Sequence, residues 1–184
     1  MTPTDVSWLV VALVAYATLA LAFVAMRDGR TWYSAPVLLP VVAAVAMGAS
    51  PMAPASPAVG VPLWIGIGLL AVVAGNPLVS LVLHLASPRT VPLQVQNSVF
   101  VTRGGTRQEE LRGGVTIGLL ERLAFLGCVL LGQPGGIAVI VAVKGLGRFN
   151  ELNTEQTRER FIVGTLASLV WVGACTAAIV LSSS

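Results

Sequence analysis

The chain is poor in charged side chains. Only 10% of its 184 residues are charged, whereas 55% are hydrophobic, and the mean hydropathy is +0.86. Water-soluble domains carry about 25% charged residues, so this composition excludes an ordinary soluble domain. It predicts an integral membrane protein folded as a single helical bundle, with little chain left over for a separate soluble domain.

Cysteine and histidine are also scarce, with two cysteines and one histidine. No spacing of these residues suits a metal site. Cys128 and Cys175 fall at similar depth in two predicted helices, where apolar packing is favoured over a disulfide. His84 is expected to be a solvated or capping residue rather than a catalytic base.

Catalytic motifs that are common in soluble enzymes are missing as well. The sequence contains no phosphate-binding GxxxxGK[ST] loop, no nucleophile elbow and no plausible Ser, His and Asp set. A lipid-modifying enzyme would need a nucleophile or a metal that this sequence does not offer. The sequence therefore favours a protein that is not an enzyme, and no cofactor is expected.

Six hydrophobic runs approach the length of about 20 residues that a membrane-spanning helix needs. They predict an all-α polytopic bundle with spans at residues 8–26, 35–48, 62–86, 115–131, 136–148 and 161–181. The second run is short and starts with two prolines, so it is the weakest predicted span. Gly75-Asn76-Pro77 interrupts the third, where proline removes a backbone donor and predicts a kink or break.

The basic residues predict the orientation. Six crossings place all 11 Lys and Arg residues at or toward one side, and leave Asp5 as the only charged side chain on the other. Basic residues favour the cytoplasmic side, so both termini are expected outside a plasma membrane. Few lysines and much Ala, Val and Gly suggest a bacterial inner membrane. Because the basic residues adjoin hydrophobic runs, no nucleic-acid partner is expected.

Two polar segments are expected on the cytoplasmic side. The loop at 87–114 carries four arginines, and a charged linker follows at 149–160. The loop is a candidate docking site for a protein partner, while the bundle itself is expected to contact membrane lipids, including anionic ones. A homo-oligomer is also possible.

Glu121 and Arg122 lie at membrane depth, where a charged side chain needs partners. Gln133, in the turn of the predicted hairpin, lies 12 residues after Glu121 and 11 before Lys144. At about 1.5 Å per residue, the two side chains reach the same depth. This predicts a Glu121 to Lys144 ion pair, or a cluster joined by Arg148. Such a pair can either form a site or only lock the hairpin.

The candidate ligand site extends this cluster. Lys144 and Arg148, with Arg112 or Arg122, would form a cationic wall for a proton, an ion or an anionic headgroup. Asn76 is a further candidate because broken helices free backbone carbonyls for binding, although a plain proline kink is the alternative. Gly164 and Ser168 form a small-xxx-small face that predicts close helix packing, against another span or a second copy.

Part of the chain resembles an uncharacterised family of bacterial multi-helix membrane proteins with no established activity. The resemblance covers about residues 112–170 and is carried by the following residues: Arg112-Gly-Gly, Ile117-Gly118, Glu121-Arg122, Gly132-Gln133, Lys144, Arg148-Phe149, Glu151-Leu152, Glu159, Phe161, Gly164-Thr165-Leu166 and Ser168. It implies that Glu121, Lys144, Arg148 and Glu159 belong together. Unlike the family, this chain has Gly145 and Gly147 beside the lysine, which predicts a less regular fifth helix.

Two functions are therefore expected as alternatives. In the first, the protein handles an ion, a small solute or an anionic lipid at a cytoplasm-facing polar cluster. In the second, it is a structural or regulatory membrane subunit, in which the same charges clamp a helical hairpin and the loop at 87–114 docks a partner.

Overall fold

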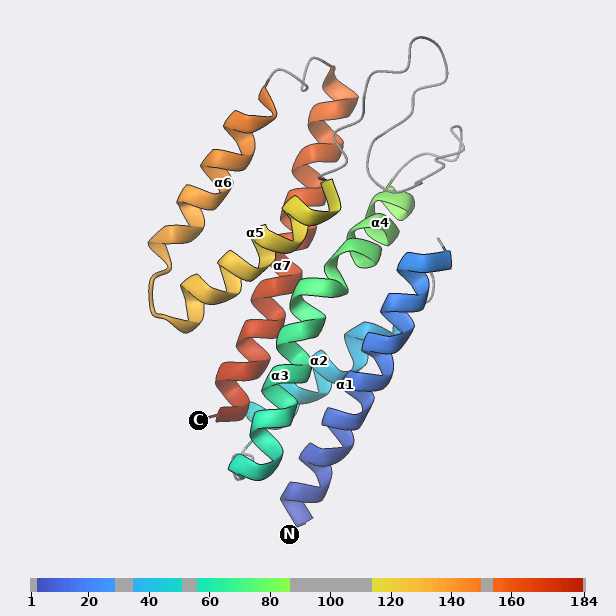
Figure 1. The fold of residues 1–184 in the computed structure, drawn as a ribbon, viewed down its shortest axis with the longest axis vertical. Helices are drawn as coiled ribbons and strands as arrows, with labels where there is room; N and C mark the ends of the chain where they lie inside the picture. The colour runs from blue at the N-terminus through green and yellow to red at the C-terminus, as the bar shows by residue number, and fades with distance from the viewer. Residues whose placement is uncertain (1–2, 29–34, 51–55, 87–113, 150–153, 184) are drawn as a thin grey trace.

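The computed structural model describes residues 3–28, 35–50, 56–86, 114–149 and 154–183, and within these ranges all long regular elements are α-helices. They are α1 (Pro3–Asp28), α2 (Leu38–Gly48), α3 (Pro57–Val73), α4 (Gly75–Ala86), α5 (Gly114–Leu130), α6 (Gly135–Gly147) and α7 (Glu155–Ser183), arranged as in Figure 1. The predicted all-α class is confirmed. Arg112 and nearly all of the predicted loop 87–114 lie outside the described residues.

Helix length separates two groups of elements. α1, with 26 residues, and α7, with 29, are long and apolar enough to cross a membrane. α3 and α4 together qualify as a third candidate span, bent by 49° at a short break. α2 and α6 are apolar but have only 11 and 13 residues. Within the described residues, two or three helices thus meet the length and composition of a membrane span, so the predicted six spans are not confirmed.

The predicted interruption of the third run is confirmed. α3 ends at Val73 and α4 begins at Gly75. Pro77 lies in the first turn of α4, where the backbone N–H that proline lacks would have no helical partner. Pro57 occupies the first turn of α3 for the same reason, so this helix starts before the predicted 62.

Two other boundaries differ from prediction. α7 begins at Glu155, inside the predicted linker 149–160, because the Thr154 hydroxyl accepts the Thr157 backbone N–H at 3.2 Å and caps the helix. α6 continues as a regular α-helix through Gly145 to Gly147, so the expected irregularity is absent from this described helix.

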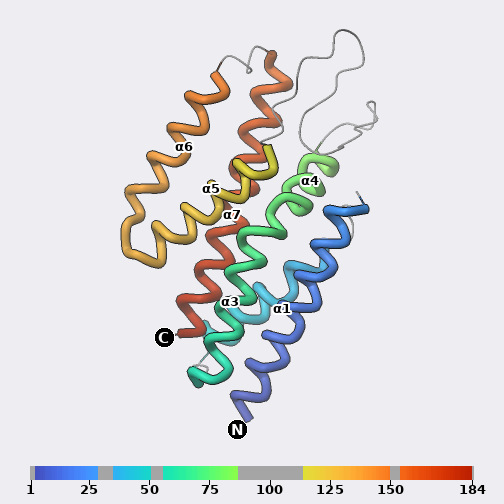
Figure 2. The backbone as a smooth tube through the Cα atoms, in the orientation of Figure 1, coloured from blue at the N-terminus to red at the C-terminus, as the bar shows by residue number. Residues whose placement is uncertain are grey.

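Contacts between helix ends define two ends of the molecule. The Ser56 N–H lies 3.4 Å from the Asp5 carboxylate, and the Trp64 indole donates to the Ser182 hydroxyl at 3.0 Å. Gly48 lies against Leu181. The two termini, the end of α2 and the start of α3 therefore share one end, as the tube in Figure 2 shows.

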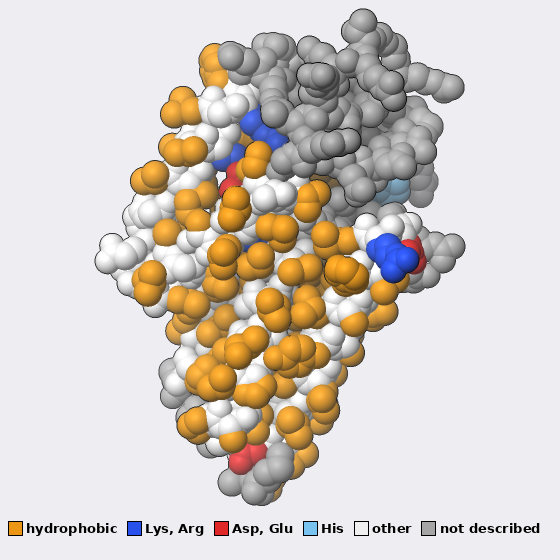
Figure 3. All heavy atoms as spheres, in the orientation of Figure 1, with side chains coloured by type: hydrophobic (Ala, Val, Ile, Leu, Met, Phe, Trp, Pro, Cys, Tyr) orange, Lys and Arg blue, Asp and Glu red, His pale blue; other side chains and the backbone are white. Residues whose placement is uncertain are grey.

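The opposite end is called the basic end. Its described residues include Arg27, Arg148, Arg158 and Arg160, against the carboxylates of Asp28, Glu155 and Glu159. In the view of Figure 3, Lys and Arg side chains lie from the middle of the molecule upward, with Asp or Glu side chains beside them. Hydrophobic side chains cover the middle and lower parts and continue up the left edge. Asp5 lies at the other end, close to the start of α3.

The core lies between α1, α2, α3 and α7. Trp8, Leu63, Ile67 and Leu70 are among its most deeply buried side chains, and the Trp171 indole donates to the Leu70 carbonyl at 3.2 Å. α5 adds Phe125 and Leu126 to this core. α6 packs mainly against α5, and none of its residues, all of which are described, is buried. The hairpin of α5 and α6 therefore flanks the core.

Candidate functional site

The α5–α6 hairpin turns sharply at Gly132. This glycine has a φ of +68°, the left-handed conformation that commonly follows a helix. The Gln133 N–H then donates to the Cys128 carbonyl at 2.7 Å, and the Gly132 N–H donates to the Val129 carbonyl at 3.0 Å. These two bonds close the end of α5 and direct α6 back antiparallel to it.

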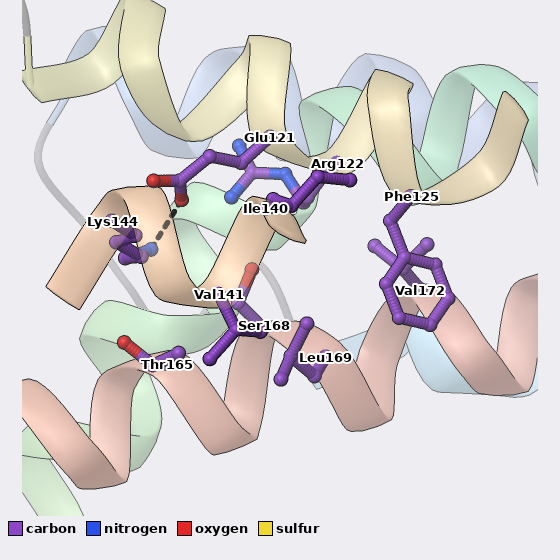
Figure 4. Close-up of a pocket in the computed structure, with 10 residues that line it drawn as sticks. All are labelled: Glu121, Arg122, Phe125, Ile140, Val141, Lys144, Thr165, Ser168, Leu169 and Val172. Atoms are coloured by element: carbon purple, nitrogen blue, oxygen red, sulfur yellow. Dashed lines mark hydrogen bonds and ion pairs between the residues drawn. The ribbon is translucent and has the colours of Figure 1, made fainter. Parts of the chain in front are cut away.

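The predicted ion pair between Glu121 and Lys144 is present. Lys144 Nζ donates to Glu121 Oε2, and the side chains are 20% and 17% exposed for Lys144 and Glu121. In Figure 4 the two point toward each other from α5 and α6, with Thr165 and Ser168 of α7 nearby. A small hollow of about 20 Å³ adjoins the pair on the side of α7.

Arg122, the neighbour of Glu121, enters the break between α3 and α4. Its Nε donates to the Val72 carbonyl at 2.7 Å, and one terminal nitrogen donates to Asn76 Oδ1 at 2.8 Å. The side chain is only 3% exposed. A buried guanidinium needs such acceptors, and a helix break supplies a carbonyl without a helical partner. Arg122 thus joins the hairpin to the broken helix.

Two glycines make room for this contact. A Cβ on Gly75 would lie 2.6 Å from both Cδ and Nε of Arg122, and a Cβ on Gly118 would lie 3.2 Å from Asn76 Oδ1. The first distance is far inside van der Waals contact, so any side chain at Gly75 would displace the arginine. The space that the Arg122 side chain occupies, called the slot below, therefore depends on one glycine of α4 and one of α5.

A cavity of about 270 Å³ opens beside this slot, between α4, α5, α7 and the last turn of α6. Among the described residues that line it, four are cationic and one is a carboxylate: Arg122, Lys144, Arg148, Arg160 and Glu121. The carboxylate of Glu121 already forms an ion pair with Lys144. The described lining therefore carries an excess of positive charge.

The lining is also rich in hydrogen-bond donors. Arginine and lysine donate and do not accept. Asn76 Nδ2 is buried and has no hydrogen-bond partner among the described residues, while its Oδ1 is held by Arg122. Because arginine can only donate, the amide cannot be flipped to satisfy the nitrogen.

The other candidates occupy distinct positions. Gly164 and Ser168 lie on the face of α7 that lines the cavity, with Gly164 within contact distance of Val79 and Leu83 on α4. The cysteines are free: Cys128 faces Gly136 across the hairpin, whereas Cys175 is buried in the core. His84 is exposed near the end of α4.

Arg160 and Thr165 line the cavity although the sequence did not single them out as site residues. They lie on the same face of α7 as Gly164 and Ser168, because residues three or four apart share a helix face. That spacing was readable in the sequence, but the helix was predicted to begin at residue 161, after the linker, and this left Arg160 off the face.

Within the described residues, no group of three or more His, Cys, Asp or Glu side chains forms a possible metal site. Comparison of the chain with protein-family models, with curated proteins and with solved structures finds no match.

Proposed function

We propose that this chain is a multi-pass membrane protein that binds an oxyanion-bearing ligand in the 270 Å³ cavity, entered from the basic end. The observation that carries the proposal is the imbalance of the lining, with four cationic side chains against one engaged carboxylate. Phosphate and carboxylate groups are the usual partners of such arginine clusters. An inorganic anion, a negatively charged solute and an anionic lipid can each supply such a group, whereas a cation cannot.

The proposed orientation places the basic end in the cytoplasm and both termini outside a bacterial inner membrane. Six hydrophobic segments enter the bilayer, and the basic residues then obey the positive-inside rule. The α5–α6 hairpin enters and leaves on the basic side. The sidedness of α7 is therefore the same whether the turn at Gly132 reaches the outer surface or stops within the bilayer.

Arg148 is the key ligand contact in this proposal. Arg122 is held by Val72 and Asn76, and Lys144 is held by Glu121. Arg148 lines the cavity, is partly exposed and has no ion-pair partner among the described residues. A guanidinium in this state can close on an anion without first breaking an internal contact.

The experiment compares Arg148→Gln with Arg27→Gln, which removes an exposed arginine from the basic end but outside the cavity lining. The thermal unfolding midpoint of the purified chain in detergent is measured with inorganic phosphate, sulfate, soluble phosphomonoesters and anionic lipids. At least one of these ligands should stabilise the parent and Arg27→Gln, with the apparent affinity lowered about tenfold in Arg148→Gln.

The proposal fails if no anion in this panel raises the midpoint in a manner that depends on Arg148. A structural or regulatory subunit is then the better function. The observation that favours this second candidate is that Arg122, Glu121 and Lys144 all make internal contacts between helices. A partner protein that co-purifies at fixed stoichiometry, without any anion effect, would support it.

A further inference from the structure

The last turn of α6 borders the cavity, and the outer surface of this helix is apolar. On α6, Lys144 turns toward Glu121 of α5, while Val143 is 64% exposed and Leu146 is 76% exposed. Val139, one turn earlier, is 62% exposed. A cationic site and an uncovered aliphatic surface therefore lie on adjacent faces of the same helix.

The cavity lining also combines cationic and apolar side chains. Beside the cations, the cavity is bordered by apolar side chains of α4, α5 and α7, which include Val79, Leu83, Ile117 and Phe161. A site for a fully hydrated, small inorganic anion has no need of such side chains. An anion attached to a hydrocarbon chain would be accommodated by both parts of the surface.

The volume limits what can enter. Pockets that enclose a whole drug-sized ligand have about 300–1,000 Å³, and this cavity has about 270 Å³. It has room for a headgroup, but a lipid's hydrocarbon chains would have to remain outside. The exposed aliphatic row of α6 provides a surface for them.

The number of donors selects among headgroups. A terminal phosphate carries a charge of about −1.5 to −2 near neutral pH and three acceptor oxygens, whereas a phosphodiester carries a single charge. Arg148 and Lys144 together carry more donors than one phosphodiester group can use. The excess of positive charge in the lining points the same way.

We infer that the ligand is a lipid with a terminal phosphate, bound with its phosphate in the cavity and its chains along Val139, Val143 and Leu146. The inference rests on the proposed oxyanion site and specifies its substrate class. The headgroup and the hydrocarbon chains contribute separately to the binding affinity, so the effect of each can be tested by removing it alone.

The test measures binding to the full chain in detergent by native mass spectrometry. Phosphatidic acid is compared with phosphatidylglycerol and phosphatidylcholine of identical chains, and with glycerol 3-phosphate, which keeps the terminal phosphate but has no chains. Phosphatidic acid should bind about tenfold more tightly than each of the other three. Arg148→Gln should reduce its binding to the level of phosphatidylglycerol, and the matched control Arg27→Gln should not.

Each alternative result has one meaning. If glycerol 3-phosphate binds as tightly as phosphatidic acid and depends on Arg148, the lipid inference is overturned while the oxyanion site stands. Equal binding of phosphatidylglycerol overturns the preference for a terminal phosphate. If none of the four binds through Arg148 and soluble anions also have no effect, both the inference and the proposed function fall.

Discussion

The molecule has two regions that are held together by different forces. In the first, formed by α1, α2, α3 and the second half of α7, the contacts are mostly apolar, and α1 alone buries eight residues. In the second, formed by α4, α5, α6 and the first half of α7, polar contacts join the helices, and none of the fully described α6 is buried. These are called the apolar region and the polar region below.

The difference explains why the cavity lies in the polar region. Between helices surrounded by lipid, association depends on close packing and on interhelical hydrogen bonds, because lipid tails are as apolar as leucine. The apolar region uses close packing, with Ala15, Ala22, Ala44 and Ala71 fully buried. The polar region uses a few strong contacts and leaves a cavity among them. Removing the contact that Arg122 makes at the joint between the regions should therefore have a larger effect than removing one apolar side chain.

The largest effect is expected from Gly75→Ala, at the joint between the regions. The new Cβ would lie 2.6 Å from Cδ and Nε of Arg122, so the guanidinium must leave Val72 and Asn76. A buried charge without acceptors and an unpaired carbonyl cost about 3 kcal/mol together. Equilibrium unfolding in detergent micelles measures this loss.

Gly127→Ala is the matched control, because it makes the same change inside α5 at a glycine with no described atom within 4 Å of the new Cβ. It should leave the free energy of unfolding unchanged or raise it by up to about 1 kcal/mol, since alanine favours helix. Equal losses at the two positions would mean that Arg122 does not hold the joint.

A smaller difference is expected within the apolar contacts themselves. Leu63, at 0% exposure, lies in the apolar region, and Leu63→Ala should lower the free energy of unfolding by about 2 kcal/mol through the cavity it leaves. Val143, at 64% exposure on α6, should lose less than about 0.5 kcal/mol on replacement by alanine. If Val143→Ala destabilises as much as Leu63→Ala, another molecule covers α6, and the two regions differ less than they appear to in the isolated chain.

The sequence predicted those parts of the structure that depend on distance along the chain. The antiparallel hairpin and the matching depth of Glu121 and Lys144 follow from counting residues on either side of the turn at Gly132. The break at Gly75 to Pro77 follows from backbone chemistry alone. Neither prediction required knowledge of which helices are neighbours.

The docking of Arg122 into the break could not be obtained in this way. Arg122 and Asn76 were separate candidates, in different runs, and nothing in their spacing brings the two runs together. Gly75 and Gly118 matter only because α5 crosses the break, so their role appears once the helices are packed. Arg160 was missed for a local reason, because Thr154 starts α7 earlier than the charge pattern suggested.

A smaller loss than at Gly75 is also expected from breaking the ion pair of the polar region. Lys144→Met leaves Glu121 partly buried without its cation, and Glu121→Gln leaves Lys144 without a carboxylate. Each variant should lower the free energy of unfolding by about 1–2 kcal/mol, because both side chains keep some contact with water.

Equilibrium unfolding of the two single variants and of the double variant measures the coupling between Glu121 and Lys144. The double variant contains no uncompensated charge at these positions, so it should regain most of the loss and show a coupling of about 2 kcal/mol. Strictly additive losses would show that Glu121 and Lys144 do not stabilise each other, and that the ion pair does not hold the hairpin together.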